Sequence, residues 1–228
     1  MNQKERREYL IKYLLDESSE YRGIKIPYDE DGQKHLLRGL INVRMPSKID
    51  KQFLDIQDAY LKEALNENGT FSLSDAIAFS DGMSLWQGDI TRLEVDAIVN
   101  AANSQMTGCY QPNHTCIDNC IHTFSGVQLR LKCAEIMDMQ GHDEPAGQAK
   151  ITPGYNLPCK YVLHTVGPII YDKVQRKDED ILASCYLSCL ELAEKYNCNS
   201  IAFCCISTGV FRFPNRRAAE IAIQTIKK

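Results

Sequence analysis

Long hydrophobic runs are missing from this chain, and none approaches the roughly 18 apolar residues of a membrane-spanning helix. The segment that begins at Met1 is charged and lacks the apolar stretch of a secretory signal peptide. Sustained blocks of Lys and Arg are also absent and the net charge is -4, which argues against general binding to nucleic acid. We therefore expect a cytoplasmic protein with neither a membrane nor a nucleic-acid partner.

Cysteine is abundant instead, with 10 among 228 residues. Without a secretory signal, this number indicates reduced thiols and metal ligation rather than a disulfide framework. Most of the cysteines lie in apolar helical or strand patterns, where Cys usually acts as a small buried hydrophobic residue. We interpret seven cysteines as packing residues of this kind: Cys133, Cys159, Cys185, Cys189, Cys198, Cys204 and Cys205.

The run of residues 100–119 has a different, polar character. It holds Cys109, His114 and Cys116 within eight residues, and Pro112 bends the chain between them. Thiolate and imidazole are ligands that zinc prefers, so this spacing predicts a zinc site. Three local ligands favour a catalytic ion with an open position, while a distant fourth ligand, redox-active thiols and inert thiols stay alternatives.

Residues 1–70 form an expected helical N-terminal extension, because apolar residues such as Leu10 and Leu14, or Phe53 and Leu61, recur there at helical spacing. A turn-rich link is expected at residues 24–32, followed by a short helix from 35 to 44. We interpret the extension as a packing element, with a role in shaping the substrate site as the alternative. Residues 71–228 form the second expected domain.

From about residue 83 onward, strand and helix patterns alternate. Strands are expected at residues 83–88, 97–100, 149–154, 161–166 and 200–206, and helices at 120–133, 181–196 and 217–226. This alternation predicts an α/β fold in which helices cover both faces of a sheet, with ligands at the carboxyl ends of the strands.

Two further loops carry weaker signals. The turn of Ser207, Thr208 and Gly209 offers backbone N–H groups that can bind phosphate oxygens. The Phe211 ring, or that of Phe213, can pack over a ribose or a base. Such turns also commonly just connect elements. Asp89, between Gly and Ile, fits an ordinary turn or helix cap as well as a ligand contact.

Taken together in order along the chain, these segments resemble the macrodomain family. The matching residues are Gly88-Asp-Ile-Thr, Asp96-Ala-Ile-Val-Asn-Ala-Ala-Asn-Ser, Ile121-His-Thr-Phe-Ser-Gly and Ile206-Ser-Thr-Gly-Val-Phe-Arg-Phe-Pro. The Cys/His loop stands where other hydrolytic macrodomains carry a glycine-rich loop, and with the helical leader it resembles the zinc-containing microbial branch. The resemblance implies a macrodomain three-layer α/β/α sandwich with a mixed central sheet. It also implies a final strand, which we expect to be absent from residues 71–228.

The resemblance implies a role for each matching residue. Asp89 would accept a hydrogen bond from the adenine amino group beside the Ile90 backbone. Asn100 and Asn103 would face the distal ribose, where Asn103 would orient hydroxyls or a water. Asp118 would be the general base, unless it only caps the following helix. Cys109, His114 and Cys116 would bind zinc. Phe211 would lie against the nucleoside, and the diphosphate would be bound by Ser207, Thr208, Gly209 and Val210.

These roles imply a zinc-dependent hydrolase that removes ADP-ribose from mono-ADP-ribosylated protein side chains. Zinc would either bind a ribose hydroxyl or activate a water, and Asp118 would accept the proton. The zinc branch further implies a lipoyl-carrier protein as the substrate and functional pairing with a sirtuin-like ADP-ribosyltransferase. The alternative is a module that binds ADP-ribose without cleaving it. Such readers need neither the zinc cluster nor Asp118, so we favour the enzyme.

Overall fold

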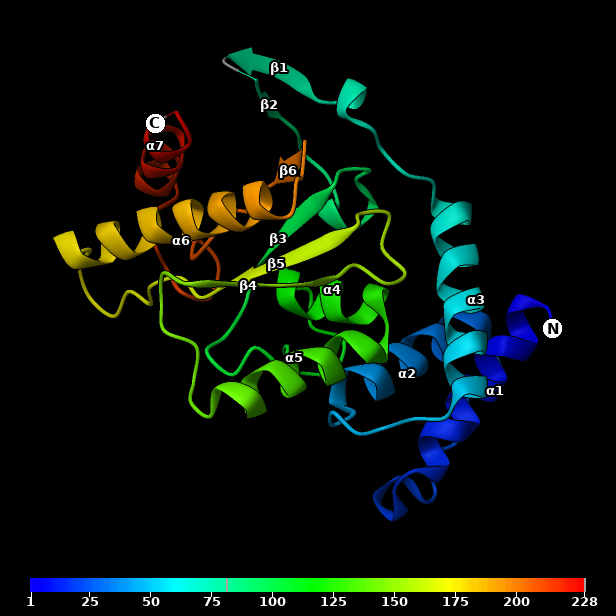
Figure 1. Ribbon diagram of the computed structural model, residues 1–228. Helices are drawn as coiled ribbons and strands as arrows, with labels where there is room; N and C mark the ends of the chain where they lie inside the picture. The colour runs from blue at the N-terminus through cyan, green and yellow to red at the C-terminus, as the bar shows by residue number, and fades with distance from the viewer. Residues whose placement is uncertain (81, 228) are drawn as a thin grey trace.

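The computed structural model of the chain describes residues 1–80 and 82–227. Within this part, three leader helices stand beside a layered α/β body (Figure 1). The leader helices are α1 Gln3–Asp16, α2 Glu30–Val43 and α3 Lys51–Asn68, and those of the body are α4 Ile117–Ser125, α5 Val127–Gln140, α6 Arg176–Lys195 and α7 Asn215–Ile226. Short 3-10 turns lie at η1 Ser19–Tyr21, η2 Leu73–Asp75 and η3 Ile90–Arg92. Among the described helices, none combines the length and the apolar character needed to cross a membrane.

The body is built on a mixed four-stranded sheet of order β4-β5-β3-β6. The strands are β3 Ala97–Ala101, β4 Ala149–Pro153, β5 Tyr161–Thr165 and β6 Ile201–Ala202. β5 and β6 both run parallel to β3, whereas β4 pairs antiparallel with β5. Because the three parallel strands end at the same edge, the loops that follow β3 and β6 leave the sheet on one side.

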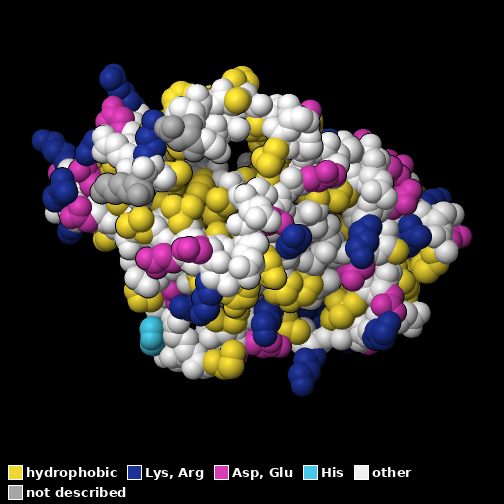
Figure 2. Space-filling model, turned by 45° about the horizontal axis from the view of Figure 1, so that its top comes forward, with side chains coloured by type: hydrophobic (Ala, Val, Ile, Leu, Met, Phe, Trp, Pro, Cys, Tyr) yellow, Lys and Arg dark blue, Asp and Glu magenta, His cyan; other side chains and the backbone are white. Residues whose placement is uncertain are grey.

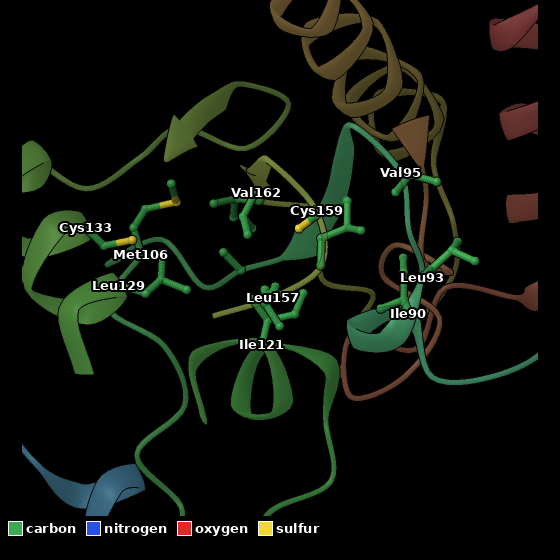
Figure 3. Packing of buried hydrophobic residues seen from close by; sticks show 13 residues of the cluster. Ile90, Leu93, Val95, Met106, Ile121, Leu129, Cys133, Leu157, Cys159 and Val162 are labelled. Carbon is green, nitrogen blue, oxygen red and sulfur yellow. The ribbon is translucent and has the colours of Figure 1, made fainter. Parts of the chain in front are cut away.

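Helices cover both faces of this sheet, which confirms the predicted three-layer sandwich. On one face, Val162 of β5 shares a buried cluster with Ile121 of α4 and Leu129 of α5 (Figure 3). The next residue, Leu163, belongs to a second cluster that includes Leu182 of α6. Side chains alternate across a strand, so β5 contributes to both cores and is buried on both faces.

The leader helices have a core of their own that also reaches the body. Leu10, Leu37 and Phe53 are buried in it, and Val127 of α5 belongs to the same cluster. The backbone N–H of Val127 donates to Gln57 Oε1 of α3 at 3.0 Å. The leader is therefore packed against α5, while the division of the chain at residue 70 stays a prediction.

The expectation of one helix at residues 120–133 is wrong, because α4 and α5 are separate helices that meet at Gly126. This glycine has φ 101°, a conformation that disfavours other residues. A Cβ there would also lie 2.5 Å from Gln128 Oε1 and 2.6 Å from Gln57 Nε2. The turn in the backbone therefore requires glycine, whereas the ends of the Gln57 and Gln128 side chains would have to move to make room for a Cβ.

Other boundaries also differ from the expected ones. The turn-rich link ends earlier than expected, because Asp29 Oδ1 accepts a hydrogen bond from Gly32 N at 2.7 Å and starts α2 at Glu30. The strand expected at residues 200–206 is only Ile201–Ala202. Cys205 is exposed, which contradicts its interpretation as a packing residue; the cysteines that are buried are Cys133, Cys159, Cys185 and Cys189.

A small hairpin projects from the body, formed by β1 Ile77–Ser80 and β2 Met83–Leu85 (Figure 1). β1 was not expected, and the strand expected at residues 83–88 pairs with it rather than with the main sheet. Ile77, Phe79 and Leu85 are exposed. Figure 2, in which this end of the molecule comes forward, shows hydrophobic side chains on the surface.

Candidate functional site

The loop between β3 and α4 brings Cys109, His114 and Cys116 together. Their ligand atoms lie within 4.8 Å of one another, and Cys109 Sγ is 3.6 Å from His114 Nδ1. In a tetrahedral site with Zn–S about 2.3 Å and Zn–N about 2.0 Å, sulfur and nitrogen are about 3.5 Å apart. The donor set therefore fits zinc. Among the described residues, no fourth His, Cys, Asp or Glu joins this group.

Backbone geometry explains how this loop folds onto α4. Gly108 has φ 86°, and a Cβ there would lie 2.8 Å from the His122 ring. Cys116 occupies the cap position of α4, where its Sγ accepts a hydrogen bond from Asn119 N at 3.4 Å. The Asn119 side chain in turn donates to the Gln111 carbonyl at 3.0 Å. The loop is thus fixed at both its start and its end against one helix.

The Cys116 thiol lies in an environment that disfavours negative charge. Its pKa is raised to about 12, mainly by burial and also by the neighbouring Cys109 and Asp118 groups, while a hydrogen bond from Asn119 N acts to lower it. A divalent cation reverses this balance, because it stabilises the thiolate directly.

Asn100 and Asn103 lie at the end of β3 and just beyond it. Asn100 is fully buried, and its Nδ2 donates to Asp118 Oδ1 at 2.8 Å and lies 3.1 Å from His164 Nδ1. Asn103 Nδ2 donates to the Gly108 carbonyl at 3.1 Å. The Oδ1 atoms of both amides are buried and have no hydrogen-bond partner among residues 1–80 and 82–227. Each can accept a hydrogen bond from a ligand hydroxyl or a water.

Asp118 lies in the first turn of α4 and is only 6% exposed. Burial raises its pKa to about 6, although the hydrogen bond from Asn100 and the nearby Arg130 oppose this shift. Its carboxylate is therefore largely ionised at neutral pH yet more basic than usual, as a general base requires. The cap of α4 is Cys116, so Asp118 does not occupy the capping position.

Two histidines beneath the site received no role in the sequence interpretation. His122 Nε2 lies 3.6 Å from Asp118 Oδ1, and within the described chain neither ring nitrogen of His122 makes a hydrogen bond. His164 Nε2 lies 2.9 Å from Thr152 Oγ1. Burial lowers the pKa of both rings, of His122 to well below its ordinary value and of His164 to about 3, so both are neutral. The four-residue spacing from Asp118 to His122 was the available signal, because such residues share a helix face.

The loop after β6 has the geometry of an anion site. Ser207 has φ 63° and a buried hydroxyl without a partner in the described residues, whereas Thr208 Oγ1 donates to the Cys205 carbonyl at 2.9 Å. Successive free N–H groups form a concave site for anions. In the part of the chain described, no hydrogen bond is made by the backbone N–H groups of Gly209, Val210 and Phe211.

Asp89 lies outside the Cys/His loop, at the cap position of η3. Its Oδ1 caps η3 by accepting from Thr91 N at 3.0 Å and Thr91 Oγ1 at 2.6 Å. The Ile90 side chain is buried, so only its backbone can face a ligand. A cavity of about 520 Å³ lies between the leader and the body, lined by Asp89, Arg38 and Phe124 among others. Of the residues expected to bind substrate, only Asp89 lines this cavity.

The layered fold, with polar loops at the carboxyl ends of its parallel strands, defines an α/β ligand-binding protein. The sequence model of the Macro domain matches residues 99–222, and the chain belongs to the macrodomain family. A Treponema medium protein named Protein-ADP-ribose hydrolase is 60% identical over 231 residues, which cover 100% of this chain and 88% of the relative. A Staphylococcus aureus (strain MSSA476) protein of the same name is 50% identical over 226 residues, covering 98% and 85%. The solved Trypanosoma brucei macrodomain in complex with ADP-ribose has a TM-score of 0.61 and 30% identity, covering 82% of this chain and 81% of that one.

Proposed function

We propose that this protein is a zinc-dependent hydrolase that removes ADP-ribose from mono-ADP-ribosylated protein side chains. The relatives named Protein-ADP-ribose hydrolase support hydrolysis, because they match nearly the whole chain at 60% and 50% identity. The observation that carries the zinc dependence is the convergence of Cys109, His114 and Cys116 directly before Asp118. A non-catalytic ADP-ribose reader would need neither the thiols nor a buried carboxylate.

The substrate would extend across the edge of the sheet. The free N–H groups of the 207–211 loop suit a diphosphate, and Phe211 suits the adjacent nucleoside. Asp89 uses one carboxylate oxygen to cap η3, which leaves the other for the adenine amino group. At the opposite end, the unpaired amide oxygens of Asn100 and Asn103 suit the hydroxyls of the distal ribose. A complex of the related Trypanosoma brucei macrodomain with ADP-ribose supports this choice of ligand.

Cleavage of an ADP-ribosyl bond develops positive charge on the ribose and requires a water at the anomeric carbon. Asn103 Oδ1 orients a ribose hydroxyl or this water, and Asp118 accepts the proton. Asn100 holds the Asp118 carboxylate through the 2.8 Å hydrogen bond, which fixes the direction in which the base acts. When bound, zinc supplies a Lewis acid for a ribose hydroxyl or for the attacking water.

The deciding experiment measures release of ADP-ribose from a mono-ADP-ribosylated protein, with the zinc content determined on the same samples. We expect release by the full chain, its loss after chelation, and its loss together with zinc in Cys116→Ala. Cys198→Ala is the matched control, because Cys198 is a thiol outside the site. Binding of ADP-ribose without release by the zinc-loaded chain would make the protein a reader. Full turnover by metal-free Cys116→Ala would exclude a catalytic zinc.

Two partners stay predictions. A lipoyl-carrier protein as the modified substrate, and a sirtuin-like ADP-ribosyltransferase as the enzyme that modifies it, follow from the resemblance to the zinc branch. Offering the ADP-ribosylated carrier protein and an unrelated mono-ADP-ribosylated protein side by side checks the first. Equal rates on both would remove the carrier protein as a preferred substrate.

A further inference from the structure

Helix α2 of the leader contacts the backbone of the Cys/His loop next to one expected zinc ligand. Arg38 Nη2 donates to the His114 carbonyl at 2.8 Å and to Asn119 Oδ1 at 3.2 Å. One turn further along α2, Asn42 Oδ1 accepts from Asn113 N at 2.9 Å. Two backbone groups on either side of the His114 Cα are thus held by side chains more than 70 residues away in the sequence.

Arg130 of α5 connects the same leader helix to the other end of the loop. Its Nη1 donates to the carbonyls that end α2, at 3.2 Å for Ile41, 2.7 Å for Asn42 and 2.6 Å for Arg44. Its Nη2 donates to the Cys109 carbonyl at 3.4 Å. The last carbonyls of a helix lack partners within the helix and carry its negative dipole end, so they hold a guanidinium well. The end of α2 therefore fixes the side chain that in turn holds Cys109.

The contact between α2 and the loop is close. A Cβ at Gly39 would lie 3.1 Å from Asn113 Nδ2 and 3.9 Å from Pro112 Cβ. Asn42 is 1% exposed, and its Nδ2 donates to Thr123 Oγ1 of α4 at 2.7 Å. A buried polar side chain with two defined partners holds its orientation more strictly than an exposed one.

We propose that α2 positions the metal loop: Arg38 and Asn42 fix the backbone around His114, and Arg130, anchored on the end of α2, fixes Cys109. This deepens the proposed function, since it rests on the zinc site proposed there. Arg38, Asn42 and Arg130 are positioning residues, because each acts on a ligand through the loop backbone. Groups that orient metal ligands typically contribute about 10- to 100-fold to metal affinity.

A leader that only packs against the body predicts a different result. Its apolar core lies among α1, α2 and α3, so a packing role affects the free energy of unfolding and leaves the intrinsic zinc affinity unchanged. Zinc affinity measured on folded protein therefore separates the two roles. This readout does not depend on hydrolase activity.

The experiment is competition for zinc between the full chain and a chelator of known affinity, with the Tm of each metal-free sample recorded. We expect the zinc Kd to rise about 10- to 100-fold in Arg38→Met and Asn42→Ala. Arg38→Lys, which keeps a charged donor, should recover part of the affinity. Arg6→Met is the matched control, because Arg6 lies on α1 and donates to Gln3. Its zinc Kd should equal that of the wild type.

Each other outcome has a defined meaning. Wild-type zinc Kd values in folded Arg38→Met and Asn42→Ala would overturn the positioning role and leave the zinc-dependent hydrolase standing. Equal zinc binding by the wild type and Cys116→Ala would instead refute the zinc site, and both proposals would fall with it. If Arg38→Met does not fold, Arg38→Lys carries the test, with a zinc affinity below that of the wild type as the expected result.

Discussion

Of the two buried histidines beneath the site, His164 should contribute a part of the pH dependence of stability that one substitution removes. His164 is 0% exposed, with Nδ1 3.1 Å from Asn100 Nδ2 and Nε2 2.9 Å from Thr152 Oγ1. Burial lowers its pKa to about 3 from the ordinary 6.5. Unfolding exposes the ring to water, where it takes up a proton below pH 6.5 that the folded protein does not bind.

The sign and the size follow from this difference in pKa. The pKa of His164 is lower in the folded than in the unfolded protein. The free energy of unfolding therefore keeps its full value above about pH 6.5 and decreases as the pH falls toward the folded pKa. The loss is about 1.4 kcal/mol per pH unit for one group. From pH 7 to pH 5 it amounts to about 2 kcal/mol. Asp118 acts in the opposite direction, because its raised pKa lets the folded protein take up a proton near pH 6.

The perturbation is His164→Gln, which replaces the imidazole by an amide that does not titrate. We expect lower stability at pH 7, because the buried ring is lost. The fall in the free energy of unfolding from pH 7 to pH 5 should nevertheless be about 2 kcal/mol smaller than in the wild type. Asp118 and His122 are present in both chains, so their contributions to the pH dependence cancel in the comparison. The exposed His142 gives the matched control, His142→Gln, which should retain the wild-type pH dependence.

Urea unfolding of the wild type and the two variants, followed by circular dichroism at the two pH values, supplies the six free energies. Metal-free protein is used throughout, so that zinc release at low pH does not enter the comparison. Equal losses of stability in His164→Gln and the wild type would refute the reasoning, because they would mean that the folded protein binds a proton at this ring above pH 5.

Three further outcomes are expected. Asp89→Ala should raise the Kd for ADP-ribose about 10- to 100-fold in calorimetry, because a hydrogen bond to a charged group contributes about 1.5–3 kcal/mol; an unchanged Kd would leave Asp89 only its capping role. Asp118→Asn should lower turnover about 10²- to 10⁴-fold with little change in ADP-ribose affinity. Turnover by the wild type should fall as the pH drops through about 6, where the Asp118 carboxylate takes up a proton. A flat pH profile there would contradict the role of Asp118 as general base. Gly126→Ala should reduce the free energy of unfolding by more than about 1 kcal/mol in urea, because φ 101° strains alanine; unchanged stability would mean that the backbone relaxes.

The sequence predicts those features whose residues are close together along the chain. Apolar runs separated by helical patterns predict the sandwich, because each face of β3 and β5 must be covered. The spacing of Cys109, His114 and Cys116 predicts a metal-type cluster because the three ligands share one short loop. Asn100 and Asp118 were predicted from a family motif, and their hydrogen bond at 2.8 Å depends on the fold.

The parts that were not predicted depend on partners far apart in sequence. His164 becomes a neighbour of Asn100 only through the parallel register of β3 and β5. At the break at Gly126, the hydrogen bond from Val127 N to Gln57 of the leader joins residues 70 apart in sequence, which no local pattern reveals. Arg130 resembles any other cation in a helix until the end of α2 is packed against it.

Helix α4 couples the metal loop to the candidate base. Cys116 is its cap and Asp118 lies in its first turn, so a shift of the helix end moves a metal donor and the carboxylate together. The positive dipole end of the helix favours negative charge at both positions. If the proposed zinc is bound, its removal would take away one constraint on the segment that carries Asp118. Loss of turnover on chelation would then combine loss of the Lewis acid with a shift of the base. The two contributions separate in Asn42→Ala at saturating zinc, because Asn42 is 1% exposed and does not line the cavity that holds Asp89. Full turnover assigns the leader to metal affinity alone, whereas reduced turnover means that α2 also maintains the position of Asp118.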